Sequence, residues 1–266
     1  MDMQLELELW KFHDIFFEEG SHSYTDSLGT KYTSVTSFVH QFSPPQDWDA
    51  IARRYALKHD FGGLSAKAAQ DPGKRDALEK EAAAAVRAMW AEAGEHACTL
   101  GTHVHAYMEN QWKRKLYTPS AGCEGYAELS AAGLRAYQEL SKRFVPIREE
   151  FIVYKASWGL CGTIDFLAYD TLKDRAVILD YKTNKEIKRE NPFQKCVGAL
   201  EGLPDCNYVH YCAQLSTYKA ILESETSVRI GGMALVHIRK DGYSVIPCAD
   251  YSDLLRRYLD GRIEER

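Results

Sequence analysis

The segment after Pro146 constrains the fold most strongly, because its pattern predicts three strands in succession. These strands are expected at 150–155, 161–169 and 176–183, with turn-forming residues between them. The third begins with the unbroken apolar run from Ala176 to Leu179, which is typical of a central strand covered on both faces. A helix at 208–222, strands at 228–238 and 243–247, and a helix from Tyr251 are expected to follow. This order predicts a layered α/β or α+β domain.

The N-terminal half predicts mostly helices. Short strands around turns are expected at 16–39, and Ser43-Pro44-Pro45 interrupts the chain. Helices are expected at 47–59, 74–98, 99–115 and 124–143, the second of them rich in alanine. We therefore expect a region at 1–99 made of N-terminal strands and a helical cap or arch, followed by a core at 100–266, with both parts in one compact unit.

Composition and charge favour a globular protein and argue against an integral membrane protein. With 45% hydrophobic and 27% charged residues, the chain has the composition of a globular domain. Its apolar runs are all shorter than the roughly 18–20 residues of a membrane span. The net charge of −5 predicts no overall basic surface, although a local basic groove is compatible with it. The acidic start lacks the basic region of a signal peptide, so we expect a cytoplasmic protein of a bacterial or phage-infected cell, with an organellar location as the alternative.

The densest chemical signal lies on two of the predicted strands. Gly162-Thr163-Ile164-Asp165 is followed fifteen residues later by Asp180-Tyr181-Lys182. Asp180 and Lys182 are two residues apart on one strand, so their side chains share a face, and Asp165 on the neighbouring strand could reach the same point. Two carboxylates beside an ammonium suit a divalent hard cation and a phosphate ester. A D-x-K triplet by itself is also typical of a solvated strand edge with a surface ion pair.

Two predicted helices carry further polar pairs at helical spacing. His105 and Glu109 are four residues apart, after Gly101-Thr102, and so are Gln214 and Tyr218. Taken singly, a histidine of this kind is also typical of a buried hydrogen-bonded side chain, and the glutamine–tyrosine pair of core packing.

The order of these pieces resembles the PD-(D/E)xK nuclease superfamily and, within it, the RecB-type exonuclease branch, which includes phage exonucleases and a mitochondrial genome-maintenance exonuclease. The branch has the pattern G-T-x-x-H-x-x-x-E, an acidic strand, G-x-x-D, D-x-K and Q-x-x-x-Y. The matching residues lie between 101 and 218 and are Gly101, Thr102, His105, Glu109, Glu150, Gly162, Asp165, Asp180, Lys182, Gln214 and Tyr218. The resemblance implies a restriction-endonuclease-like core with a central mixed sheet flanked by helices.

The resemblance also implies roles for individual residues. The metal ligands would be His105, Asp165, Asp180 and the backbone carbonyl of Tyr181. Lys182 would orient water and stabilise the transition state, and Glu109 and Glu150 would be auxiliary catalytic groups. The residues expected to contact DNA are Thr183, Lys185, Gln214 and Tyr218; Lys185 is included because it belongs to a basic run after the D-x-K motif.

The expected cofactor is Mg²⁺ or Mn²⁺, since imidazole with hard oxygens suits manganese, and carboxylates with water suit magnesium. Seven cysteines, an odd number without a C-x-x-C pair, favour reduced thiols over a disulfide framework or a zinc ribbon. Some RecB-type nucleases hold an iron–sulfur cluster with four cysteines. Here Cys196, Cys206 and Cys212 are spaced by ten and six residues, which argues against such a cluster.

The expected function is a metal-dependent exonuclease that hydrolyses phosphodiester bonds from single-stranded or duplex DNA ends, in recombination, repair or replication. A recombination or replication protein could be its partner. The alternatives are a structure-selective endonuclease on the same fold, a non-catalytic DNA-binding module, and an unrelated metallohydrolase that uses His103 and His105. The last of these leaves the spacing of Asp165, Asp180 and Lys182 unexplained.

Overall fold

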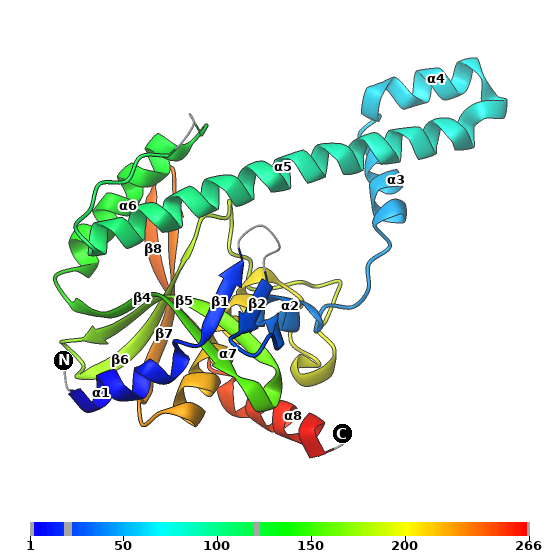
Figure 1. The fold of residues 1–266 in the computed structure, drawn as a ribbon. Helices are drawn as coiled ribbons and strands as arrows, with labels where there is room; N and C mark the ends of the chain where they lie inside the picture. The colour runs from blue at the N-terminus through cyan, green and yellow to red at the C-terminus, as the bar shows by residue number, and fades with distance from the viewer. Residues whose placement is uncertain (1–2, 19–22, 120–122, 265–266) are drawn as a thin grey trace. The chain divides into compact units, whose positions relative to one another are not determined.

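A computed structural model describes residues 3–18, 23–119 and 123–264 of the chain (Figure 1). The chain divides into two compact units, one made of residues 1–44 and 101–266 and the other of residues 45–100. Residues 1–44, which the sequence grouped with the helical region, belong to the unit with the main sheet because their third strand pairs with a strand of that sheet. No helix in the described part of the chain is long and apolar enough to cross a membrane.

The first unit is built on an eight-stranded sheet with the order β1-β2-β3-β5-β6-β7-β8, in which β4 pairs with the remaining edge of β5. β3 and β5, and β6 and β7, are parallel, whereas the other neighbours are antiparallel. The predicted mixed sheet is therefore confirmed. The strands are β1 (Ile15–Glu18), β2 (Ser23–Asp26), β3 (Lys31–Ser34), β4 (Phe144–Lys155), β5 (Leu160–Asp170), β6 (Arg175–Lys182), β7 (Ile230–Arg239) and β8 (Gly242–Pro247).

Strand β5 divides its pairing between three neighbours. Along one edge it pairs with β4 over its whole length. Along the other it pairs with β6 from Phe166 to Asp170 and with β3 at Leu160 and Cys161. Residues 162–165 therefore lie in a fork between β3 and β6. The strands separate at this point, so side chains of β5 and β6 can converge on a ligand there.

Helices flank both faces of this sheet (Figure 1). Helix α7 (Asn207–Glu225) packs on one face against β4 to β7, and α2 (Val35–His40) and α8 (Ser252–Glu264) pack beside it. Helix α6 (Tyr126–Leu140) packs on the other face against β7 and β8, together with the residues of α5 that follow Leu100. A short helix, α1 (Met3–Leu9), precedes β1.

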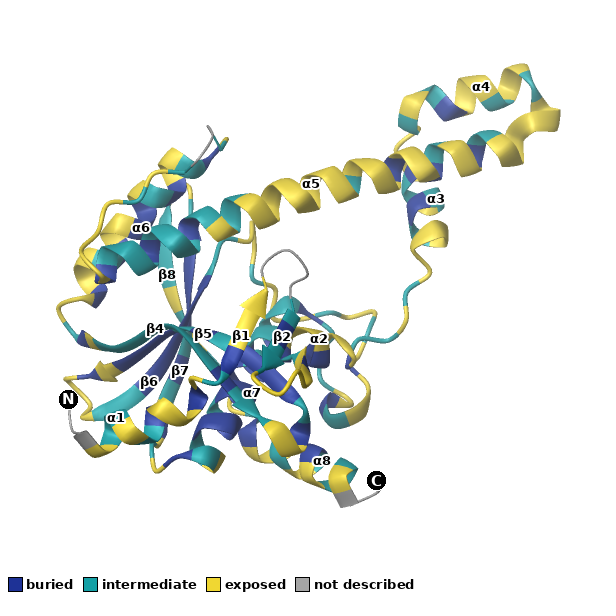
Figure 2. Ribbon diagram, in the orientation of Figure 1, coloured by how far each residue is buried: buried dark blue, intermediate teal, exposed yellow. Residues whose placement is uncertain are grey.

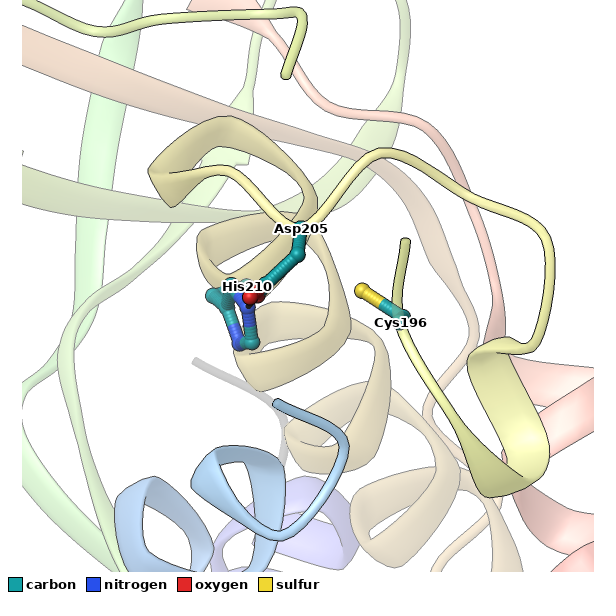
Figure 3. Close-up of side chains that lie close together, drawn as sticks. All are labelled: Cys196, Asp205 and His210. Atoms are coloured by element: carbon teal, nitrogen blue, oxygen red, sulfur yellow. Dashed lines mark hydrogen bonds and ion pairs between the residues drawn. The ribbon is translucent and has the colours of Figure 1, made fainter. Parts of the chain in front are cut away.

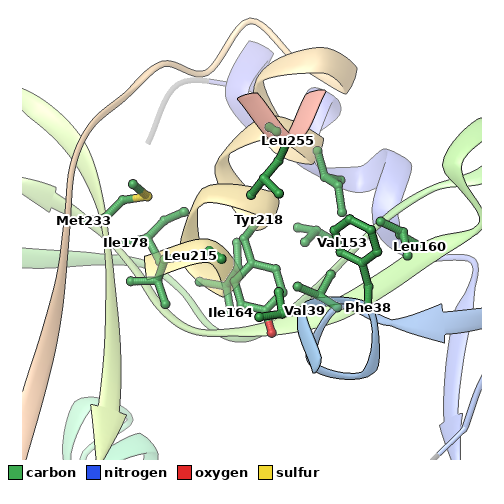
Figure 4. Close-up of a cluster of buried hydrophobic side chains, with 14 of the residues drawn as sticks. Phe38, Val39, Val153, Leu160, Ile164, Ile178, Leu215, Tyr218, Met233 and Leu255 are labelled. Atoms are coloured by element: carbon green, nitrogen blue, oxygen red, sulfur yellow. The ribbon is translucent and has the colours of Figure 1, made fainter. Parts of the chain in front are cut away.

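The main core lies between the sheet and α7. Leu215 and Tyr218 of α7 pack against Ile164 of β5 and Ile178 of β6, with Phe38 of α2 in the same cluster (Figure 4). All five side chains are buried, as are the inner strands and the sheet-facing sides of the helices (Figure 2). The unbroken apolar run of β6 is thus covered as its sequence predicts.

The second unit is helical. It contains α3 (Trp48–Lys58), α4 (Leu64–Gln70), the short turns η2 (Phe61–Gly63) and η3 (Pro72–Lys74), and the first part of α5 (Arg75–Trp112). Its small core contains Ala52, Ala56 and Val86. The two helices expected at 74–98 and 99–115 are one continuous helix, because the segment is rich in strong helix formers and the only glycines that interrupt them, Gly94 and Gly101, do not break it.

Candidate active site

Asp165 stands at the fork in the sheet. The backbone N–H of Tyr181 donates a hydrogen bond of 2.8 Å to Asp165 Oδ2, so a side-chain carboxylate replaces the strand-to-strand bond that is lost where β5 and β6 separate. Burial opposes ionisation of this carboxyl group, but the positive charges of His105 and Lys182 outweigh it and hold the pKa of Asp165 below its usual range. Asp165 is thus a fixed, charged group next to the end of β6.

His105 reaches Asp165 from helix α5. Its Nδ1 lies 3.3 Å from Asp165 Oδ2, and its ring meets the ring of Tyr181 edge to face. Burial disfavours the charged imidazole, but the adjacent negative charge of Asp165 outweighs it and raises the pKa of His105 to about 9. The predicted histidine and the predicted aspartate are therefore in contact, although they are sixty residues apart in the chain.

Asp180 and Lys182 lie at the end of β6 and share a face, as their spacing predicts. Lys182 Nζ is 2.5 Å from Asp180 Oδ2, and the Asp180 residue is 1% exposed. Burial, followed by the charge of Asp165, raises the pKa of Asp180 to about 6. Neither carboxylate oxygen of Asp180 has a hydrogen-bond partner in good geometry among the described residues, which is unusual for a buried acid.

Glu150 approaches the same point from β4. The pairs Glu149–Phe166 and Phe151–Ile164 flank it, so Glu150 lies opposite Asp165. Its φ of 45° is left-handed, a conformation that costs a non-glycine residue free energy and that is most common at functional sites. Burial and then the charge of Asp165 raise the pKa of Glu150 to about 8. The backbone is thus strained where it brings a third carboxyl group to the fork.

The grouping fits a divalent cation. Ligand atoms of His105, Glu150 and Asp165 all lie within 4.8 Å of one another, and Asp180 adds two buried oxygens, one of which is in contact with Lys182 Nζ. Carboxylate oxygens with one imidazole form a donor set suited to a hard or borderline divalent ion. A cation there would also offset the repulsion between the carboxylates that raises the pKa values of Glu150 and Asp180.

A comparison with known families agrees with this geometry. The sequence profile of the PD-(D/E)XK nuclease superfamily matches residues 50–265. The chain belongs to this superfamily. The resemblance noted in the sequence is confirmed at the superfamily level, and membership indicates a metal-dependent nuclease that would bind DNA. A search of curated proteins found no match.

The nuclease places its glutamine–tyrosine pair behind the fork. Gln214 Nε2 donates a hydrogen bond of 2.9 Å to the hydroxyl oxygen of Tyr218. The Tyr218 ring lies directly against the backbone of Gly162, where a Cβ would come within 2.6 Å of it. Gly162 is therefore the residue type that lets α7 approach the fork this closely.

Tyr211 is a site residue that the sequence reasoning missed. Lys182 Nζ lies 4.7 Å from the centre of its ring, and its hydroxyl donates a hydrogen bond of 2.6 Å to Asn184 Oδ1. Tyr211 therefore holds both the lysine and the segment that follows β6. The signal was present, since Tyr211, Gln214 and Tyr218 have the spacing of one helix face, but tyrosines in an apolar helix are also typical of core packing.

The other predicted residues lie in different surroundings. Glu109 is bound to Lys113 one turn further along α5, although its charge contributes to the raised pKa of Glu150. The Tyr181 side chain points away from Asp180, and its hydroxyl accepts a hydrogen bond of 2.8 Å from Trp112 Nε1. Any contribution of Tyr181 to a metal would therefore come from its backbone.

Two of the predicted DNA contacts follow β6 directly. Thr183 Oγ1 lies 3.5 Å from the position a Cβ would take on Gly101, so the start of the predicted histidine motif is adjacent to the end of the D-x-K motif. Lys185 is exposed two residues later, on a segment without regular secondary structure. The structure thus brings Thr183 next to the site and leaves Lys185 open to solvent.

Proposed function

We propose that the chain is a DNA exonuclease of the RecB-type branch, which hydrolyses phosphodiester bonds from DNA ends with Mg²⁺ or Mn²⁺. The observation that carries the proposal is the convergence of Asp165, Asp180, Glu150, His105 and Lys182 on one fork in the sheet. A buried set of like-charged carboxylates costs stability unless a cation binds there. The order of the motifs supports the branch.

The ligands of the metal would be Asp165, Asp180, His105 and the backbone carbonyl of Tyr181, with Glu150 beside them. A bound cation polarises the phosphate and lowers the pKa of a water molecule. Asp165 is held in place by the backbone N–H of Tyr181, so it is already oriented before a ligand arrives. Glu109 would act only through its charge, since Lys113 occupies its carboxylate.

Lys182 would stabilise the negative charge that develops on the phosphoryl oxygens in the transition state. Its ammonium is held between Asp180 and the face of the Tyr211 ring, which restricts its position. Thr183 and Lys185 would contact phosphates of the bound strand just beyond the lysine, and Gln214 and Tyr218 would position the lysine and the DNA from behind the sheet.

The test is a cleavage assay on end-labelled linear DNA and covalently closed circular DNA, each single- and double-stranded, with Mg²⁺, Mn²⁺ or a chelator. We expect metal-dependent loss of linear DNA while circles stay intact. Asp180→Asn and Lys182→Ala should each lower the rate by at least about a hundredfold. The first removes a charged ligand of the cation, and the second removes the ammonium that stabilises charge on the phosphoryl oxygens. Asp241→Asn is the matched control, since this carboxylate is 78% exposed in a turn after β7.

Each other outcome overturns a specific part of the proposal. Nicked or linearised circles would show an endonuclease on the same fold. Binding of DNA without cleavage by the folded wild-type chain would show a non-catalytic module. Full activity of Lys182→Ala, with circular dichroism matching the wild type, would remove the lysine from the mechanism.

A further inference from the structure

A second group of metal-binding side chains lies outside the fork, where the segment after β6 meets the start of α7. Cys196, Asp205 and His210 offer ligand atoms that all lie within 4.8 Å of one another. Figure 3 shows the three side chains side by side, with the sulfur of Cys196 directed toward Asp205 and His210. Cys196 is 2% exposed, and the side chains of Asp205 and His210 are 10% and 13% exposed, so the group is shielded from water.

The hydrogen bonds within this group leave some of its metal-ligand atoms without a strong partner among the described residues. His210 Nε2 lies 2.6 Å from Asp205 Oδ1, and Ser43 Oγ donates a hydrogen bond of 2.9 Å to the same oxygen. The Cys196 thiol has a long contact of 3.6 Å with the carbonyl oxygen of Pro204. His210 Nδ1 is buried without a hydrogen-bond partner in the described parts of the chain. A buried imidazole nitrogen of this kind calls for an explanation.

The group also lies in a long connection that has little secondary structure to hold it in place. Between the end of β6 and the start of α7 the chain runs from 183 to 206 without a strand or an α-helix, which is longer than most connections in compact domains. Cys196 is near the middle of this segment and Asp205 near its end, while His210 is on the first turn of α7. A link between them would fix the loop that connects Lys182 to the helix bearing Tyr211.

We propose that Cys196, Asp205 and His210 bind a zinc ion, with Ser43 or water in the fourth position. One thiolate, one imidazole and one carboxylate form a donor set that zinc accepts, whereas the thiolate disfavours the magnesium or manganese of the fork. Zinc–ligand bonds of about 2.0–2.3 Å place tetrahedral ligand atoms roughly 3.3–3.8 Å apart. Shifts of about 1 Å would bring the observed group to that geometry.

The role of this ion is structural. It would displace the proton of the Cys196 thiol to water and take the place of the hydrogen bond between His210 and Asp205, and it would join three points of the chain that otherwise meet through hydrogen bonds. Binding to the folded state alone stabilises that state and raises its melting temperature. None of its ligands belongs to the fork, so the ion would take no direct part in the nuclease mechanism.

The test uses the full chain stripped with a chelator and titrated with Co²⁺ and then Zn²⁺. We expect one equivalent of Co²⁺ to give the ultraviolet charge-transfer absorption of a cobalt–thiolate bond, and Zn²⁺ to abolish it. Cys196→Ser should lack this absorption, while Cys98→Ser, which alters an exposed cysteine on α5, should keep it. Zn²⁺ should raise the melting temperature of the wild type and of Cys98→Ser by several degrees, and that of Cys196→Ser by much less.

The readouts are binding and stability, so failure of the nuclease proposal would leave this test unaffected. Absence of the cobalt–thiolate absorption in the wild type would overturn the zinc site, and so would equal absorption in Cys196→Ser. A melting temperature of the wild type that is indifferent to both Zn²⁺ and chelator would show that the group is a metal-free hydrogen-bond cluster. If Cys196→Ser does not fold, the cobalt–thiolate absorption of the wild type still tests the site, because a cation bound by the histidine and carboxylates of the fork gives no such absorption.

Discussion

Replacing Gly162 by alanine tests whether the close approach of α7 to the fork holds the site together. A Cβ on this residue would lie 2.6 Å from Tyr218 Cε1 and 3.2 Å from the Tyr218 hydroxyl oxygen. Carbon atoms prefer separations of about 3.5–4.0 Å, so the ring must move by about 1 Å. Tyr218 is 3% exposed and packed within the main core, which leaves it little room to do so.

The expected loss of stability follows from three contributions. Overpacking of a core by a methyl group costs about 1–3 kcal/mol. Displacement of the Tyr218 hydroxyl from Gln214 Nε2 costs about 1 kcal/mol more. Alanine has less backbone entropy than glycine in the unfolded chain, and this difference stabilises the folded state by roughly 0.5–1 kcal/mol. Gly162→Ala should therefore lower the free energy of unfolding by about 1–3 kcal/mol, and lower the cleavage rate as well because the fork is displaced.

The measurement is urea denaturation followed by circular dichroism, with Gly261→Ala as the matched control. Gly261 is in α8, and a Cβ there would meet no atom within 4 Å, so the same substitution should be neutral or stabilise by up to about 1 kcal/mol. Tyr218→Leu removes the atoms with which the new methyl group clashes. The loss of unfolding free energy in the double variant Gly162→Ala/Tyr218→Leu should therefore be smaller, by at least about 0.5–1 kcal/mol, than the sum of the losses in the two single variants. Wild-type stability of Gly162→Ala, or strict additivity in the double variant, would refute the reasoning.

Three further substitutions test other contacts. Asp170→Asn should lower stability by about 2–3 kcal/mol at pH 7, because the buried carboxylate accepts two hydrogen bonds from the partly exposed Arg143. Arg143 lowers the pKa of Asp170, so this contribution is complete above the ordinary carboxyl pKa of about 4 and is lost as the pH falls below it. Urea denaturation of the wild type and of Asp170→Asn should therefore show a smaller difference in unfolding free energy below pH 4 than at pH 7. Tyr211→Ala should slow cleavage about tenfold by removing the ring that restrains Lys182, whereas Tyr211→Phe, which keeps the ring, should lose less in the same assay. Ser34→Ala should lower the free energy of unfolding in urea by about 1 kcal/mol, because the Ser34 hydroxyl oxygen caps the N-terminus of α2.

Local chemistry made part of this molecule predictable from sequence. The strand that ends in Asp180 and Lys182 was predictable because an unbroken apolar run indicates a buried strand and period two sets which side chains share a face. The pair of Gln214 and Tyr218 was predictable from helical spacing, and the two side chains do meet. These features depend on neighbours within a few residues, so the sequence holds the necessary information.

The features that sequence could not supply are set by contacts between distant segments. The fork exists because β3, near residue 33, pairs with β5 near residue 160, and no pattern in either strand specifies that partner. The left-handed backbone of Glu150 follows from its place opposite Asp165, whereas local preference favours glycine or asparagine there. The group of Cys196, Asp205 and His210 has no recognisable spacing, since Cys196 comes from an irregular segment and His210 from a helix.

The fork explains why the strained and repulsive features occur together. If β5 and β6 stayed paired through Asp165 and Asp180, backbone hydrogen bonds would be satisfied, but the space between the strands would be closed to a ligand. Because the strands separate, the N–H of Tyr181 bonds to the Asp165 carboxylate instead, and Glu150 opposite it adopts a left-handed conformation. A merely structural sheet would gain from closing this gap and from replacing Asp180, a buried carboxylate that contacts Lys182 but has no hydrogen bond of good geometry among the described residues. The arrangement is therefore best understood as one in which stability is lost at the position where the cation and the phosphate would bind.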